Sequence, residues 1–142
     1  FDQDADAVNN IEAQKGFTFI ASNFRHIARF MDYYNELGKV DAVLADLGVS
    51  SHHFDTPERG FSFRCASATL DMRMNTRKGQ SAADIIAEYS EEQLAKILYE
   101  YGELRQSRQL ARRIVQARET NPIRTIGDLL LILSQMELLV CA

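Results

Sequence analysis

A change of pattern at Asp46 constrains the fold of this chain more than any other feature of its sequence. Before it, short apolar or aromatic stretches at residues 17–21 and 40–45 alternate with stretches of helical spacing at residues 5–14 and 23–38. Strands that alternate with helices are typical of a parallel, doubly wound sheet. The first third of the chain therefore predicts part of an α/β domain.

After Asp46 the alternation stops. Residues 47–79 show no sustained period and contain turn-forming glycines and a proline, and so long a loop is usually functional. Four helical patterns follow, three of which begin with a Ser or Thr that has a capping partner three residues on. We expect a sheet domain at residues 1–79 and a helical domain at 80–134, inserted in it or appended to it. Residues 135–142 fit either a helix or a strand.

The composition is that of an ordinary globular protein, with 142 residues of which 46% are hydrophobic and 25% charged. No apolar run approaches the roughly 20 residues that span a membrane, so no membrane partner is expected. The chain lacks an initiator Met and opens on "FDQDADAV", which resembles the end of a strand, so we interpret it as a fragment. Its two distant cysteines predict a reducing, cytoplasmic compartment.

The charge is unevenly distributed. The formal net charge is -4, but residues 59–78 and residues 101–124 are each net positive because arginines gather there. Such basic segments in an acidic chain are typical of a local nucleic-acid contact. The alternative, which charge alone leaves open, is that the arginines only solvate exposed faces.

Two carboxylates follow expected strand ends. Asp2 follows an aromatic residue and Asp46 follows the apolar residues 40–45. A carboxylate in this position typically accepts hydrogen bonds from the hydroxyls of a ribose. Alternatively, Asp2 or Asp4 caps the next helix and Asp46 caps a turn. A glycine-rich phosphate turn, which would lie before Asp2, does not occur in the sequence.

The long loop also contains adjacent histidines, His52 and His53, and the segment "RGFSFR". Adjacent histidines on an irregular loop rarely share one metal ion, and no third ligand has suitable spacing, so we predict no metal site. The mixture of arginine and aromatic residues fits base stacking and phosphate binding. Equally, Phe61 and Phe63 could anchor the loop to the core.

The motifs "DLGVSS", "ERGFSF" and "LDMRM", in this order and spacing, carry a close resemblance to one family. It is the MraW-type family of ribosomal RNA small subunit methyltransferases H. These enzymes use S-adenosylmethionine to methylate the N4 amine of a cytidine in bacterial small-subunit (16S) ribosomal RNA. "GQSAADII", "YGE" and "ARRIVQARE" extend the resemblance over nearly the whole chain.

The resemblance implies a Rossmann-like methyltransferase domain with an inserted helical domain, and residues 135–142 as the return to the former or a divergent tail. It implies S-adenosylmethionine as cofactor, the small ribosomal subunit as partner, and a homodimer as a candidate assembly. At matching positions, Asp2 resembles the acid that holds the ribose, and Phe24 the residue beside the adenine. Asp46 resembles the pocket acid, and His53 stands at a polar cofactor contact.

The chemistry then points to Asp46 as the candidate catalytic residue. The lone pair of the cytosine amine is delocalised, and an acceptor aimed at its protons localises and orients it. The target base must be turned out to reach such a pocket. Five arginines of the two basic segments are expected to hold RNA phosphates: Arg59, Arg64, Arg73, Arg112 and Arg113.

The sequence departs from the family at several points. The glycine-rich first motif and the final strands are absent, and "CASAT" replaces a short turn before "LDMRM". We therefore expect the fragment alone to be inactive. The alternatives are a dinucleotide-dependent oxidoreductase, which would carry an upstream glycine turn, and a non-catalytic helical interaction module.

Overall fold

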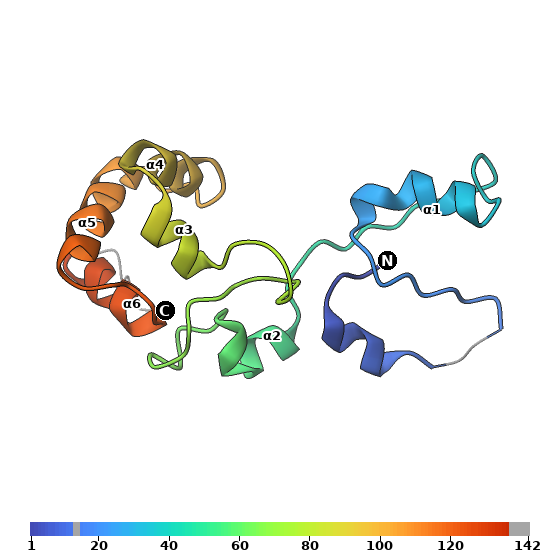
Figure 1. Ribbon diagram of the computed structural model, residues 1–142, viewed down its shortest axis with the longest axis horizontal. Helices are drawn as coiled ribbons and strands as arrows, with labels where there is room; N and C mark the ends of the chain where they lie inside the picture. The colour runs from blue at the N-terminus through green and yellow to red at the C-terminus, as the bar shows by residue number, and fades with distance from the viewer. Residues whose placement is uncertain (13–14, 137–142) are drawn as a thin grey trace. The chain divides into compact units, whose positions relative to one another are not determined.

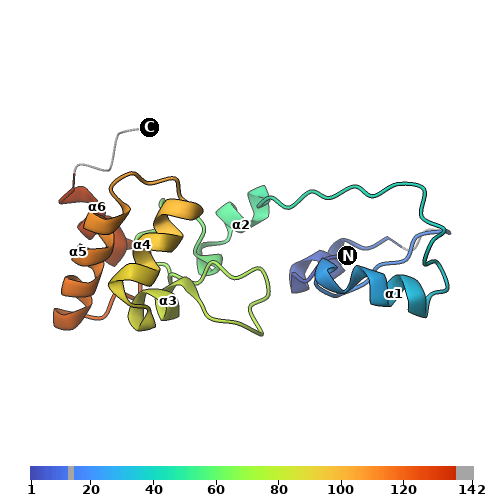
Figure 2. The same ribbon diagram turned by 90° about the horizontal axis from the view of Figure 1, so that it is seen from above.

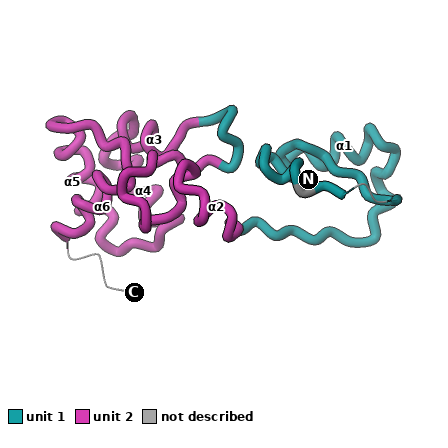
Figure 3. Tube along the Cα trace, turned by 90° about the horizontal axis from the view of Figure 1, so that it is seen from below, with its two compact units in different colours: residues 1–48, 74–79 teal, residues 49–73, 80–142 magenta. Residues whose placement is uncertain are grey.

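The computed structural model describes residues 1–12 and 15–136, and it divides into two compact units (Figure 3). The first unit comprises residues 1–48 and 74–79, and the second comprises residues 49–73 and the chain from Gln80 onward. The chain thus passes from one unit to the other three times, so neither unit is a single continuous segment.

The first unit contains three short helices: η1 (Ala5–Asn10), η2 (Phe24–His26) and α1 (Ile27–Tyr33). Asp4 is the N-cap of η1, because its carboxylate accepts the N–H of Asp6 at 3.0 Å. The predicted helix at residues 5–14 is therefore confirmed at its start, although it is a shorter 3₁₀ helix. The helix predicted to reach Gly38 ends at Tyr33, because Asn35 takes a left-handed φ of 58° and turns the chain away.

The strands predicted at residues 17–21 and 40–45 do not form in the described part of the chain. A single parallel bridge joins Asp2 to Ala21, and residues 40–45 are extended and exposed, with Leu44 97% accessible. Apolar residues make a strand only where a neighbouring backbone completes the hydrogen-bond ladder. Here no second described segment pairs with residues 40–45.

The second unit holds the remaining helices of the described residues, and it confirms the four that were predicted after residue 80 (Figure 1). Its helices are α2 (Ser51–Asp55), η3 (Pro57–Arg59), α3 (Ala82–Glu88), α4 (Glu91–Glu100), α5 (Ser107–Thr120) and α6 (Ile126–Ser134). Capping boxes at Ser81, Ser90 and Thr125 start α3, α4 and α6, as their sequences predict. No helix within the described residues is both long and apolar enough to cross a membrane.

Helix α5 lies at the centre of the core of this unit. Leu110, Ala111 and Ile114 lie on one face of α5 and are almost wholly buried, while its arginines lie mostly on other faces. This helix contacts α3, α4 and α6, and Figure 2 shows the same group of helices from above. The core therefore fixes the direction in which each α5 arginine projects.

The loop at residues 49–73 packs with the helices that follow it. Leu70 donates its N–H to the carbonyl of Arg124, and Ile126 donates to the carbonyl of Ala68, each at 3.0 Å. These bonds attach the loop to the start of α6. The sequence pattern had grouped this loop with the residues that precede it, and the structure shows that it shares the helical core.

Candidate functional site

Two segments of the first unit lie side by side at the parallel bridge. Asp2 donates its N–H to the carbonyl of Ile20 at 3.2 Å and is bridged to Ala21. The Asn23 side chain donates to the Gln3 side chain at 3.0 Å. The segments run in the parallel direction that the sequence predicts, and they bring Asp2 close to the start of η2.

Asp2 and Phe24 both remain accessible there. Asp2 is exposed, and one of its oxygens accepts the N–H of Asp4 at 2.8 Å. A carboxylate has capacity for further hydrogen bonds, so Asp2 can still accept from ligand hydroxyls. Phe24 is 54% exposed, which leaves a ring surface for stacking. A free acceptor and an open aromatic ring are two features that a nucleoside site uses, and the neighbours of these two residues, Gln3 and Asn23, are in contact.

Asp46 is exposed and caps a local turn. One of its carboxylate oxygens lies 3.3 Å from the N–H of Gly48, which is the turn alternative that the sequence left open. No hydrogen bond or ring contact joins Asp46 to Asp2 or Phe24 within the described residues. The three belong to the same unit, and the structure shows no closer association.

His53 belongs to the second unit and is buried. Its Nδ1 accepts the backbone N–H of Ser50 at 2.9 Å and lies 3.0 Å from the Ser50 hydroxyl, so it completes the first turn of α2. Its ring centroid is 5.2 Å from that of Phe61, which supports the expectation that Phe61 anchors the loop. Within the described residues no three His, Cys, Asp or Glu side chains gather as a metal site requires.

Two arginines that were predicted to contact RNA, Arg59 and Arg73, instead bond to other residues of the loop. Arg59 is only 6% exposed, and its Nη2 donates to the carbonyl of Arg73 at 3.1 Å. Arg73 forms a two-point ion pair with Asp71, at 2.9 Å from Nε and 2.6 Å from Nη2. The hydrogen bonds from Arg73 hold the pKa of Asp71 below its usual value, although burial opposes this, and the same contacts raise the pKa of Arg73.

Gly60 allows the motifs "ERGFSF" and "LDMRM" to pack closely against each other in space. Its φ is +73°, in the left-handed region that favours glycine. A Cβ atom at this position would lie 2.5 Å from the carbonyl oxygen of Thr69 and 2.7 Å from the nitrogen of Asp71. "ERGFSF" and "LDMRM" are therefore two sides of one closely packed turn.

The arginines of α5 have different environments. Arg112 is exposed, with its Nε 3.4 Å from a Glu91 carboxylate oxygen, and Arg113 is half-buried. Arg118 donates through Nη1 to the carbonyls of Ile86 and Tyr89, which closes the C-terminal end of α3. Arg118 therefore has a structural role, which a charge count alone does not reveal.

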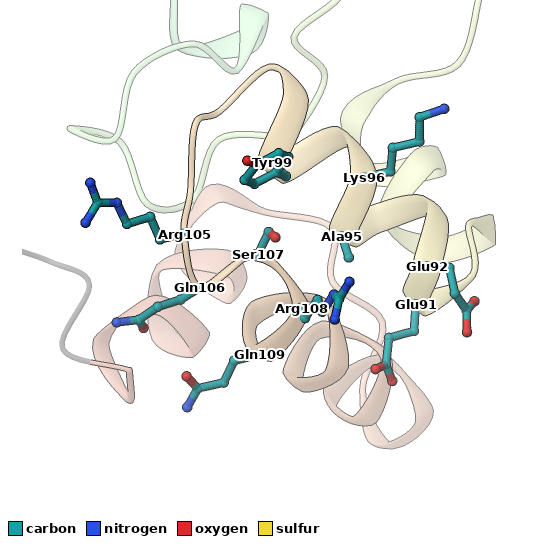
Figure 4. Close-up of a pocket in the computed structure, with 10 residues that line it drawn as sticks. All are labelled: Glu91, Glu92, Ala95, Lys96, Tyr99, Arg105, Gln106, Ser107, Arg108 and Gln109. Carbon is teal, nitrogen blue, oxygen red and sulfur yellow. The ribbon is translucent and has the colours of Figure 1, made fainter.

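A hollow of about 850 Å³ lies between α4 and the start of α5, and no sequence pattern named above predicts it (Figure 4). Tyr99, Arg105, Ser107 and Arg108 contribute to its lining. The signal that could have found it is an exposed aromatic pair followed by arginines in "YEYGELRQSR". This stretch was treated as part of the basic segment at residues 101–124, so its aromatic residues were not considered together with its arginines.

Comparison with known proteins places the chain among methylases. The model of the MraW methylase family matches residues 1–138, and the chain belongs to that family. The resemblance based on "DLGVSS", "ERGFSF" and "LDMRM" is thereby confirmed. Membership implies a Rossmann-like methyltransferase fold, and it argues against the oxidoreductase alternative.

Curated relatives named Ribosomal RNA small subunit methyltransferase H are similar to this chain throughout the matched region. Those of Parabacteroides distasonis, Porphyromonas gingivalis and Bacteroides thetaiotaomicron are 62%, 58% and 57% identical over 130, 132 and 136 residues. The alignments cover 92%, 92% and 96% of this chain and 42%, 42% and 44% of the relatives. The chain therefore spans less than half the length of these relatives.

Proposed function

We propose that the full-length protein containing this chain transfers a methyl group from S-adenosylmethionine to the N4 amine of a cytidine in small-subunit ribosomal RNA. The observation that carries this proposal is the shared name of relatives that are 57–62% identical to the chain. The proposed partner is the small ribosomal subunit, and the proposed compartment is the cytoplasm.

The proposed cofactor site uses Asp2 and Phe24. When bound, S-adenosylmethionine supplies a methyl group on a sulfonium centre. The exposed Asp2 carboxylate would accept hydrogen bonds from its ribose, and the open ring of Phe24 would pack on its adenine. Support comes from the parallel bridge, which places Asp2 beside the segment that leads into Phe24.

Asp46 is the proposed catalytic residue. The carboxylate is exposed and its only described contact is with the nearby Gly48 N–H, so it has acceptor capacity for the amine protons. Accepting a hydrogen bond from the amine would localise the nitrogen lone pair and point it at the methyl group. The carbonyl groups of the loop after Asp46 are the alternative acceptors.

His53 is also proposed as a cofactor contact, and its environment narrows how it would act. Because Nδ1 is occupied by Ser50, the contact would use the ring edge that does not face Ser50. The buried ring would then position the start of the loop as well as touch the ligand.

The proposed RNA contacts divide into two groups. Arg64, Arg112 and Arg113 are the ones proposed to reach phosphates, since Arg64 and Arg112 are exposed and Arg113 is partly so. For Arg59, which is buried, and Arg73, which is paired with Asp71, the geometry supports a role in shaping the loop.

We also infer a methyltransferase domain at residues 1–79, with a parallel sheet, and an inserted helical domain at 80–134. This inference rests on the change of pattern at Asp46.

The test supplies the full-length protein with labelled S-adenosylmethionine and unmodified small ribosomal subunits, followed by digestion and identification of the methylated nucleoside. We expect N4-methylated cytidine, and its loss in Asp46→Ala with cofactor binding retained. Asp46→Asn is the matched variant, which keeps an acceptor oxygen but removes the charge. Cofactor binding without transfer to cytidine in the unsubstituted protein would overturn the proposal.

A further inference from the structure

We propose that the hollow between α4 and α5 binds one nucleotide of a single RNA strand, with its phosphate at the start of α5 and its base on Tyr99. This rests on the proposed function and deepens it, because it assigns a separate anchoring subsite for the substrate RNA. The hollow lies wholly within the second unit, whereas Asp2, Phe24 and Asp46 belong to the first.

The hollow has room for a nucleotide and is formed by two packed helices. Its volume is about 850 Å³, and α4 and α5 form its walls. Figure 4 shows Tyr99 and Ser107 near the segment that leads into α5, the Arg105 side chain extending outward from that segment, and Arg108 between Ser107 and Glu91. Binding sites for small organic groups have volumes of this order.

The start of α5 has no side-chain cap, although the N–H of Ser107 itself donates to the carbonyl of Leu104 at 3.1 Å. Gln106, the N-cap, makes no side-chain capping bond, whereas Ser81, Ser90 and Thr125 cap α3, α4 and α6. The N–H groups of a first helical turn have no intrahelical partner, and the positive end of the helix favours an anion there.

Ser107 supplies a hydroxyl group inside the hollow. The residue is only 5% exposed, and what remains accessible of it lines the hollow. Its hydroxyl makes no hydrogen bond to any residue that the structure describes, and it is not enclosed by protein atoms. It can therefore donate a hydrogen bond to a phosphate oxygen bound in the hollow.

Two arginines at the hollow are available for an anion. In the described part of the chain neither Arg105 nor Arg108 forms an ion pair, and both are exposed. Arg112, one helical turn beyond Arg108, is instead engaged by Glu91. Arginine pairs readily with phosphate through two parallel hydrogen bonds.

Tyr99, Glu91 and Glu92 indicate at which end of the hollow the nucleotide would bind. Tyr99 is 63% exposed although it is a large ring, and stacking of a base on such a ring tolerates any base. Glu91 and Glu92 line the end nearest the start of α4 and would repel a phosphate. The nucleotide is therefore placed at the end formed by Tyr99, Arg105 and Ser107.

The test measures binding of a fluorescently labelled single-stranded RNA, spanning the target cytidine, to the full-length protein at several salt concentrations. Arg105→Glu and Arg108→Glu should each weaken binding about tenfold and flatten the salt dependence by about one phosphate contact. Arg124→Glu, an exposed arginine outside the hollow, is the matched charge control and should weaken binding by less than about twofold. Thermal melting of each variant verifies folding.

A second comparison tests the contribution of the Tyr99 ring separately from that of its hydroxyl. Tyr99→Ala should weaken binding about tenfold, whereas Tyr99→Phe should bind as the parent, because stacking needs the ring and not the hydroxyl. In methyl-transfer assays the Arg108→Glu change should raise KM for RNA and leave kcat and cofactor affinity unchanged. A merely structural role of Arg108 would impair all three.

The two proposals fail in different ways. If the parent methylates cytidine but Arg105→Glu and Arg108→Glu bind RNA no more weakly than Arg124→Glu, the hollow is not an RNA subsite and the proposed function stands. If the parent binds RNA through the hollow but methylates no cytidine, the subsite stands and the proposed function falls. Equal weakening by Tyr99→Phe and Tyr99→Ala would overturn the stacking assignment.

Discussion

Gly60 lies against the backbone of Asp71 so closely that a Cβ atom on residue 60 would be 2.7 Å from the Asp71 nitrogen. The contact brings two motifs that are separate in the sequence into one turn. In the same turn, Met72 donates its N–H to the carbonyl of Arg59 at 3.0 Å. The shape of the loop therefore depends on the absence of a side chain at one position.

Gly60→Ala should destabilise the protein by about 2 kcal/mol or more. The left-handed φ costs about 1–2 kcal/mol for a residue with a Cβ, and the overlap with backbone atoms adds to it. Gly79→Ala is the matched control, since Gly79 also has a left-handed φ but has open space around it, so only the first cost applies. Urea unfolding measures both, and equal losses would show that the close packing is unimportant.

Asp71→Asn should change how stability depends on pH. The folded pKa of Asp71 is lowered, chiefly by the Arg73 hydrogen bonds, so its stabilisation is fully present above the unfolded pKa of about 4. It is lost as the pH falls through the lowered folded pKa. Melting temperatures should therefore show parent and variant separated at pH 7 and converging as the pH falls below that of the unfolded carboxyl.

Asp41→Asn serves as the control for that comparison. Asp41 is exposed and its side chain forms no hydrogen bond or ion pair with the described residues, so its substitution should change stability by less than about 0.5 kcal/mol. A gap between parent and Asp71→Asn that stays constant throughout the acid range would contradict the role given to the Asp71 carboxylate.

Arg118→Met should cost more stability than Arg112→Met, although both arginines lie on α5. Arg118→Met leaves the carbonyls of Ile86 and Tyr89 without their donor, at an expected cost of about 1–3 kcal/mol. Arg112 makes only an exposed contact with Glu91, worth less than about 0.5 kcal/mol. Hydrogen exchange should show faster exchange in α3 for Arg118→Met alone, and similar exchange in both variants would argue against the structural role of Arg118.

Thr125→Ala should destabilise α6 by about 1 kcal/mol, because its hydroxyl accepts the N–H of Asp128 at 3.2 Å and begins the helix. Thr125→Ser keeps the hydroxyl and should retain most of the stability. Chemical unfolding compares the two. If the Ser variant loses as much as the Ala variant, the lost methyl group rather than the cap is responsible.

The helices could be predicted from the sequence because their signals are local. The Ser–Asp and Ser–Gln spacings that start α3 and α4 act within one turn, and apolar spacing fixes the buried face of α5. The strand predicted at residues 40–45 does not form in the described part of the chain, because a strand depends on a partner that is distant in the sequence and that a local apolar pattern does not reveal.

Only part of the candidate site could be predicted from the sequence, for a similar reason. Motif resemblance predicts Asp2, Phe24 and Asp46 as site residues, and the structure leaves all three exposed. It could not show that Arg59 is buried, because burial arises from contacts with residues far along the chain. The pairing of Asp71 with Arg73 is local, but the sequence analysis assigned Arg73 to phosphates because it counted charges rather than neighbours.

The bonds from Ala68 and Leu70 to the start of α6 also set an order of assembly during synthesis. The loop at residues 49–73 leaves the ribosome well before Arg124 and Ile126, which provide its partners. Until those residues emerge, the loop can form its bonds to the start of α3, where Ala82 and Ala83 donate to the carbonyls of Asp71 and Leu70, but not its bonds to α6. The nascent chain therefore carries "ERGFSF" and "LDMRM" attached on one side only through the synthesis of α4 and α5, and the second attachment forms when α6 begins.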